Sequence, residues 1–170
     1  FWQNANTQPP ILTARQASVV VGSDIYLLGG RGAGGSLLNN FQKYSTATNT
    51  WLDMVLIPGD GFLNTTAVYL PAKNGLNPRI YIPGGSIQSS DQAYSRVHKY
   101  YDFGTGTWNT AKQVGDGVPG VTQAFAYAAA APNNAKDGYF LTGGAIGPGF
   151  PVITTTKALS QTLLYRSATN

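Results

Sequence analysis

Short apolar runs separated by glycine-rich and polar turns fill this chain, and they predict strands rather than helices. Residues 19–21 and 25–28 are continuously apolar, which is typical of strands buried on both faces. Residues 41–45 alternate between apolar and polar side chains, as a half-buried strand does. No segment combines a helical period with a capping residue. The pattern therefore predicts an all-β fold.

The same succession of predicted elements occurs almost three times. Each copy has an apolar strand that ends in two glycines, at Gly29-Gly30, Gly84-Gly85 and Gly143-Gly144, and these pairs are 55 and 59 residues apart. Each copy then continues to a tyrosine, and the first two reach a tryptophan: Tyr44 and Trp51, Tyr100 and Trp108, and Tyr165 alone. Repeats of this period indicate units that stack around a shared core.

A double glycine followed by a tyrosine and a tryptophan resembles the kelch repeat of β-propellers, and the resemblance covers nearly the whole chain. It implies three kelch-like four-stranded blades within a single domain over residues 1–170. We expect the blade units at about residues 14–55, 64–112 and 121–170. Closed propellers typically have about four to eight blades, so we expect half of a six-bladed ring.

The two ends of the chain match across the third unit. Tyr44 and Trp51 are seven residues apart, and if the C-terminus were joined to the N-terminus, the same spacing would separate Tyr165 from Trp2. Propellers commonly close their ring in this way, so the resemblance implies that residues 1–8 complete the third blade. Two copies could exchange these strands in a homodimer, or the chain could be a segment of a longer protein; a chance match is the remaining alternative.

Composition adds a low density of charge to this picture. Charged residues make up 11% of the chain, against about a quarter in typical globular proteins, and the net charge is +4. The charges are scattered, so we expect no nucleic-acid partner. No apolar run approaches the roughly 18 residues of a membrane-spanning helix. The uncharged polar surface favours an extracellular or cell-surface protein, and Asn64 begins a glycosylation sequon.

The absence of cysteine and the presence of one histidine, His98, restrict the chemistry. Thiolate, zinc and copper sites lack their usual ligands, so we expect no cofactor and no metal. Copper radical oxidases of the galactose oxidase type carry a kelch-like propeller, but their site needs a Tyr–Cys crosslink and two histidines. The resemblance therefore does not bring that activity. We interpret His98 as a structural residue of a strand, beside Tyr100.

Two aspartates, Asp60 and Asp116, recur between glycines in the loops that join the predicted blades. Such Asp–Gly sequences favour tight turns, which is the preferred interpretation. If the two carboxylates converged on the central channel, they could bind a ligand or act as acid and base. A propeller-type hydrolase or lyase is therefore the alternative function.

The loops after the glycine pairs are the expected ligand-binding face, because kelch propellers usually bind partners there. Arg31, Gln88, Asp91 and Tyr94 lie in these loops, and arginine and tyrosine are frequent in binding hot spots. We expect a non-catalytic module that binds a protein or a surface carbohydrate. A scaffold fragment of a larger secreted enzyme is a third possibility, because fold alone does not decide function.

Overall fold

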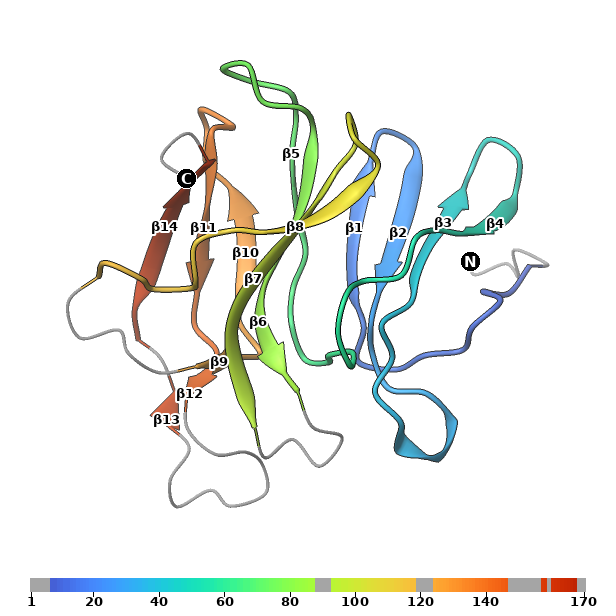
Figure 1. Ribbon diagram of the computed structural model, residues 1–170, viewed down its shortest axis with the longest axis horizontal. Helices are drawn as coiled ribbons and strands as arrows, with labels where there is room; N and C mark the ends of the chain where they lie inside the picture. The colour runs from blue at the N-terminus through green and yellow to red at the C-terminus, as the bar shows by residue number, and fades with distance from the viewer. Residues whose placement is uncertain (1–6, 88–92, 119–123, 147–156, 159, 168–170) are drawn as a thin grey trace, which may run out of the picture.

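A computed structural model describes residues 7–87, 93–118, 124–146, 157–158 and 160–167. The described chain is almost entirely β, with a single short 3-10 turn at Ala33–Gly35. Its strands form three blades that stand side by side, as Figure 1 shows. Within these residues no helix is long and apolar enough to cross a membrane. The all-β prediction is confirmed, with antiparallel sheets consistent with kelch blades.

Blade one is a four-stranded antiparallel sheet whose strands follow chain order. Its strands are β1 (Ala17–Val21), β2 (Asp24–Leu28), β3 (Phe41–Ser45) and β4 (Thr50–Asp53). A glycine turn joins β1 to β2, and Gly22 there has a φ of 61°. Tyr44 of β3 lies opposite Trp51 of β4, and their ring centroids are 5.0 Å apart. The tyrosine and tryptophan of the repeat are thus a cross-strand pair.

Blade two repeats this arrangement with longer central strands. It contains β5 (Val68–Leu70), β6 (Arg79–Ser86), β7 (Tyr94–Asp102) and β8 (Thr107–Thr110). Trp108 of β8 lies opposite Tyr101, so Tyr101 and not Tyr100 is the repeat tyrosine. Successive strand residues face opposite sides, and this one-residue difference changes which blade each ring contacts. Tyr101 faces blade one, whereas Tyr100 packs against the core between blades two and three.

Blade three has three strands in the described residues: β10 (Ala129–Pro132), β11 (Gly138–Thr142) and β14 (Thr162–Arg166). The fourth strand was predicted from residues 1–8. Residues 1–6 lie outside the described residues, and Thr7 and Gln8 belong to no strand. The four-stranded prediction therefore holds for blades one and two, and the completion of blade three stays a prediction.

A small ribbon joins blades two and three at one end. Its strands are β9 (Phe125–Ala126), β12 (Ala145–Ile146) and β13 (Lys157–Ala158). Ser95 of β7 pairs with Phe125 of β9, so the connected sheet around blade two has seven strands. Tyr127 has a φ of 61° and separates β9 from β10.

The first strand of each blade lies at the centre of the fan. β5 contacts both β1 and β10. In blades one and three the later strands lie progressively farther from β5 (Figure 1). One apolar cluster, which includes Tyr26, Phe41 and Ile80, fills the junction between blades one and two. A second fills the junction between blades two and three, with Tyr81 and Tyr139. The blades are therefore held together by packing of their faces.

The double glycines have one backbone geometry in all three blades. The first glycine of each pair has a φ of 63°, 66° or 66°, and the second has a φ of 107°, 108° or 91°. A Cβ atom on Gly30 would also lie 2.8 Å from the carbonyl oxygen of Ala14. Side-chain-bearing residues rarely adopt this conformation, and there is no room for one here. The most visible feature of the repeat is therefore a requirement of the backbone.

Candidate ligand-binding face and inter-blade cavities

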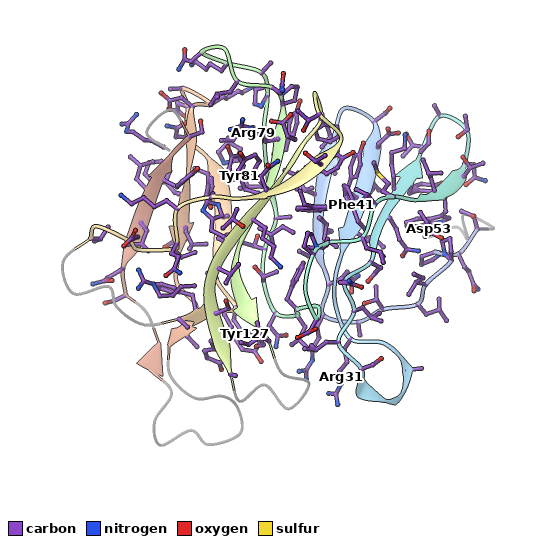
Figure 2. All side chains as sticks on the ribbon, viewed as in Figure 1. Arg31, Phe41, Asp53, Arg79, Tyr81 and Tyr127 are labelled. Carbon is purple, nitrogen blue, oxygen red and sulfur yellow. The ribbon has the colours of Figure 1, made fainter. Side chains whose placement is uncertain are left out.

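A backbone hydrogen-bond chain connects the three blades at the end where Arg31 and Tyr127 lie (Figure 2). The residues that form it, Arg15, Asn64 and Tyr127, each precede the first strand of a blade and have φ values of 59°, 55° and 61°. Asn64 donates its N–H to the Arg15 carbonyl at 3.1 Å, and Tyr127 donates its N–H to the Asn64 carbonyl at 2.7 Å. We call this end of the molecule the loop face.

Tyr127 presents an exposed and firmly held aromatic ring on the loop face. The residue is 46% exposed. Its hydroxyl oxygen accepts a hydrogen bond from Asn64 Nδ2 at 2.9 Å, and its ring makes a T-shaped contact with Tyr94 at a centroid distance of 6.3 Å. A ring held through both its hydroxyl and an aromatic contact loses little conformational entropy when a ligand binds.

The predicted ligand residues of the loop face have different environments. Arg31 is half-buried, and its backbone pairs with Ala14 in both directions. Its guanidinium lies against Gly35. Tyr94 is only 9% exposed, and its ring contacts that of Tyr127. Gln88 and Asp91 lie outside the described residues.

Sequence reasoning did not select Tyr127. It stands in a run of small apolar residues, and its role depends on Asn64, which is 63 residues away in the chain. The only signal in the sequence that could have indicated Tyr127 is its position, which Arg15 and Asn64 occupy in the other two blades.

Asp60 lines a cavity of about 200 Å³ at the junction between blades one and two. The opposite wall carries Ile82 of β6 and Val97 and Lys99 of β7. Lys99 Nζ donates a hydrogen bond to the carbonyl of Pro58. Burial lowers the pKa of Lys99 below its ordinary value, and the negative charge of Asp60 partly opposes this effect. The cavity thus combines an apolar wall with one acidic and one basic group.

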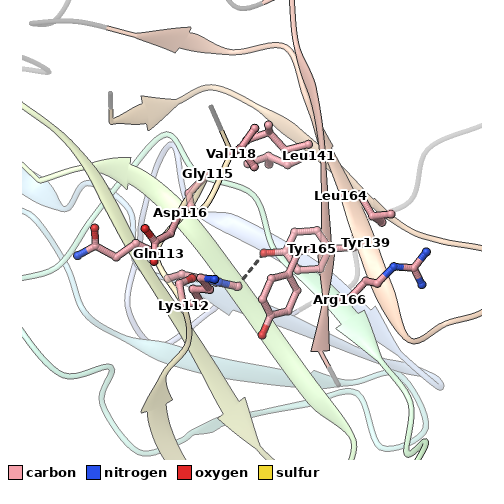
Figure 3. Close-up of a pocket in the computed structure, with 13 residues that line it drawn as sticks. Lys112, Gln113, Gly115, Asp116, Val118, Tyr139, Leu141, Leu164, Tyr165 and Arg166 are labelled. Carbon is pink, nitrogen blue, oxygen red and sulfur yellow. Dashed lines mark hydrogen bonds between the residues drawn. The ribbon is translucent and has the colours of Figure 1, made fainter. Parts of the chain in front are cut away.

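Asp116 lines a separate cavity of about 150 Å³ between blades two and three, shown in Figure 3. The side chains of Tyr139, Leu141 and Tyr165 form its blade-three wall, and the segment from Lys112 to Val118 forms the opposite side. The two aspartates therefore lie on opposite faces of blade two. They form no acid–base pair, which removes the geometric basis for the hydrolase or lyase alternative.

His98 forms part of the wall of this second cavity and is 1% exposed. Its Nδ1 donates to the Lys112 carbonyl at 2.9 Å, and its Nε2 accepts from the Tyr139 hydroxyl at 2.7 Å. Burial lowers the pKa of His98 to about 4, and the bond to the Lys112 carbonyl only partly opposes this. Both ring nitrogens are occupied in a neutral imidazole, which agrees with the structural role inferred from the sequence.

The predicted glycosylation residue, Asn64, is 8% exposed. Its Nδ2, the atom to which a glycan would be attached, donates hydrogen bonds to Ser86 Oγ at 3.4 Å and to Tyr127 at 2.9 Å. In the folded chain this amide therefore supports the loop face, and a glycan there would displace Tyr127.

Metal ligands do not gather in the part of the chain that the structure describes. Among these residues no group of three or more histidine, cysteine, aspartate or glutamate side chains could hold a metal ion.

In a comparison with protein families, residues 13–54 match the kelch motif. The match covers the chain from just before β1 to the end of β4. Blade one matches the kelch motif. It covers about a quarter of the chain, and blade two and the described strands of blade three repeat its glycine geometry and antiparallel strand order. A search of curated proteins found no match.

Proposed function

We propose that this protein is a non-catalytic binding module whose kelch-like blades present a ligand-binding loop face. Kelch motifs are associated with protein-binding β-propellers, which supports a protein ligand. The observation that carries the proposal is Tyr127, an exposed ring held in place by Asn64 and Tyr94. Arg31 on the same face adds a cation (Figure 2). Ile87, which directly follows β6 and is exposed, adds an apolar side chain. Aromatic and arginine side chains dominate the energetics of many interfaces.

A carbohydrate is the second candidate ligand. The flat ring of Tyr127 is half exposed and rigidly held, and a sugar ring can pack on such a surface. The low charge of the chain suits an uncharged ligand and an extracellular or cell-surface location. We propose that location on the same grounds.

We also propose that a second copy completes the ring in a six-bladed homodimer. One repeat position, three residues before the double glycine, supports this. Tyr26 is 5% exposed and Tyr81 is 0% exposed, because another blade packs over each. Phe140 holds the same position in blade three and is 42% exposed. A blade one from a second copy would cover Phe140 as blades two and three cover the others.

The binding proposal is tested by panning a displayed peptide library and probing a glycan array with the intact protein. We expect Tyr127→Ala to lower the signal of any selected peptide or glycan at least tenfold, since a hot-spot truncation costs about 2 kcal/mol or more. Leu56→Ala, at another exposed apolar residue, is the control and should leave the signal unchanged. Ligands that bind both variants as well as the wild type would show that the loop face is not the binding site.

A further inference from the structure

The junction between blades one and two shows how a fourth-strand tryptophan ties neighbouring blades together. The ring centroid of Trp108 lies 5.2 Å from that of Phe41 and 5.4 Å from that of Tyr101. Its Nε1 donates a hydrogen bond to the carbonyl of Val55 at 3.2 Å. An indole from β8 thus packs between an aromatic ring of each blade and bonds to the segment that leaves blade one.

The positions that surround Trp108 recur one blade later. Each junction has the same backbone hydrogen bond, accepted by Phe41 in the first and by His98 in the second, both at 2.8 Å. The residue after the donor is Val55 in the first junction and Lys112 in the second. Lys112 is therefore the equivalent of Val55, whose carbonyl accepts the hydrogen bond from Trp108.

Tyr165 completes this equivalence. Tyr101 pairs with Ile80 across the two middle strands of blade two, and Tyr165 pairs with Tyr139 in the same way in blade three. Ile80 and Tyr139 are equivalent because each stands four residues before the double glycine of its blade. The ring that flanks Trp108 on its own blade thus corresponds to Tyr165.

His98, Lys112 and Tyr165 all line the cavity of about 150 Å³ between blades two and three (Figure 3). A cavity of about this size can hold an aromatic ring. The Lys112 carbonyl, which accepts a hydrogen bond from His98, is the equivalent of the Val55 carbonyl that accepts from Trp108. The cavity is therefore lined by rings and by a carbonyl acceptor at positions equivalent to those that surround Trp108.

Trp2 has the chain spacing that this cavity requires. Arg15 and Asn64 are equivalent, because both precede the first strand of a blade with positive φ and are linked by a backbone hydrogen bond. Asn64 lies thirteen positions after Trp51, and Arg15 lies thirteen positions after Trp2. Trp2 thus stands where the fourth-strand tryptophan of the blade before blade one would stand.

We propose that the cavity between blades two and three is a socket for Trp2 of a second copy, whose first residues add to β14 as the fourth strand of blade three. This inference rests on the homodimer proposed above. Thr13 and Ala14 bond to Gly29 and Arg31, so the N-terminal segment departs from blade one. Blades one and three lie at opposite ends of the molecule (Figure 1). A second copy that continues the ring brings its own N-terminal segment to β14.

The register of the exchanged strand follows from blade two. There Tyr101 pairs with Trp108 and Lys99 pairs with Thr110. Transferred to blade three, these pairs become Tyr165 with Trp2 and Leu163 with Asn4. The wild-type chain has no cysteine, so a cysteine pair can report this register without background.

We expect the double variant Asn4→Cys/Leu163→Cys to form a disulfide-linked dimer under mild oxidation, seen by non-reducing electrophoresis. Asn4→Cys/Leu164→Cys is the matched control, because Leu164 faces the other side of β14. It should crosslink at least several-fold less. A disulfide within one chain would overturn the role of the second copy, and equal crosslinking in the control would overturn the register.

Removal of the indole tests the socket itself. We expect Trp2→Ala to convert the dimer to a monomer by light scattering, while Phe1→Ala, on the opposite face of the strand, stays dimeric. Far-ultraviolet circular dichroism checks that both variants remain folded. If Trp2→Ala keeps the dimer mass, the socket is wrong and the proposed dimer stands. If the wild type is itself a monomer, both proposals fail.

Discussion

His98 shows how the same repeat position serves two different junctions. It holds the place of Phe41, and both side chains are buried beneath the neighbouring blade. The ring of His98 lies 4.6 Å from that of Tyr165 and 5.4 Å from that of Tyr81, measured between centroids. Because imidazole is polar, this junction also needs the Lys112 carbonyl and the Tyr139 hydroxyl as partners. A histidine alone was therefore not a sign of catalysis here.

The buried histidine makes stability depend on pH. Its pKa is about 4 in the folded protein and about 6.5 when unfolded, so the unfolded chain binds a proton first as the pH falls. We expect the free energy of unfolding to be highest above pH 6.5 and to fall by roughly 3 kcal/mol as the pH is lowered towards 4. Urea unfolding at about pH 7 and about pH 4.5 measures this change.

The control for this prediction is His98→Gln, which does not titrate. The chain has no glutamate, and the pKa values of Asp102 and Asp137 are lowered from 3.8, so these carboxylates titrate below the window. The variant should therefore lose most of the pH dependence between 4 and 6.5. A wild-type stability that stays flat across this range would contradict the buried neutral histidine.

At the level of single residues, the sequence predicted the repeat better than the site. It placed Tyr44 and Trp51 correctly, but it chose Tyr100 over Tyr101 because the loop after the second glycine pair differs in length from the first. The constant spacing to the tryptophan would have favoured Tyr101, since the two residues are cross-strand partners. Tyr127 could not be predicted, because its environment is formed by residues far away in the chain.

Among the elements, the double glycines are the part of each blade that most restricts which residues the backbone can accept. Gly30 has a φ of 107°, and a Cβ there would lie 2.0 Å from Thr13 Oγ1 and 2.8 Å from the Ala14 carbonyl oxygen. The second of these contacts is with backbone and cannot be relieved by a rotamer change. This glycine therefore fixes the path by which the chain reaches β1.

We expect Gly30→Ala to lower the free energy of unfolding by about 3 kcal/mol or more, because backbone strain and steric overlap both act. Gly22→Ala is the matched control. Gly22 also has positive φ, but nothing lies within 4 Å of the place of its Cβ, so only about 1 kcal/mol should be lost. Denaturant unfolding compares the two. Equal losses would mean that the close approach at Gly30 does not affect stability.

The strands themselves were largely predictable. Strand β2 (Asp24–Leu28) covers the apolar run at residues 25–28, and β3 (Phe41–Ser45) coincides with the alternating run at residues 41–45. The prediction failed where long-range pairing overrides the local pattern. β6 continues through its double glycine as far as Ser86, with a register shift between Pro83 and Gly85, because β7 pairs with it on both sides of the irregularity.

At the scale of the whole molecule, the two end blades differ from the middle one. Blade two is covered on both faces, whereas Val20 on blade one and Phe140 on blade three are 60% and 42% exposed. Apolar side chains on the faces of stacked units favour further stacking. The spacing of Trp2 leads to the same proposal from the sequence, and the cavity between blades two and three is the site that we propose for this tryptophan.

The central claim is that three kelch-like blades form half of a ring that a second copy completes. The mass of the intact chain in solution, measured by light scattering over a range of concentrations, tests this most directly. The account predicts a mass of twice 18.0 kDa that persists on dilution into the low micromolar range, about what the proposed strand exchange should withstand. A mass of 18.0 kDa for the folded chain at all concentrations would contradict it.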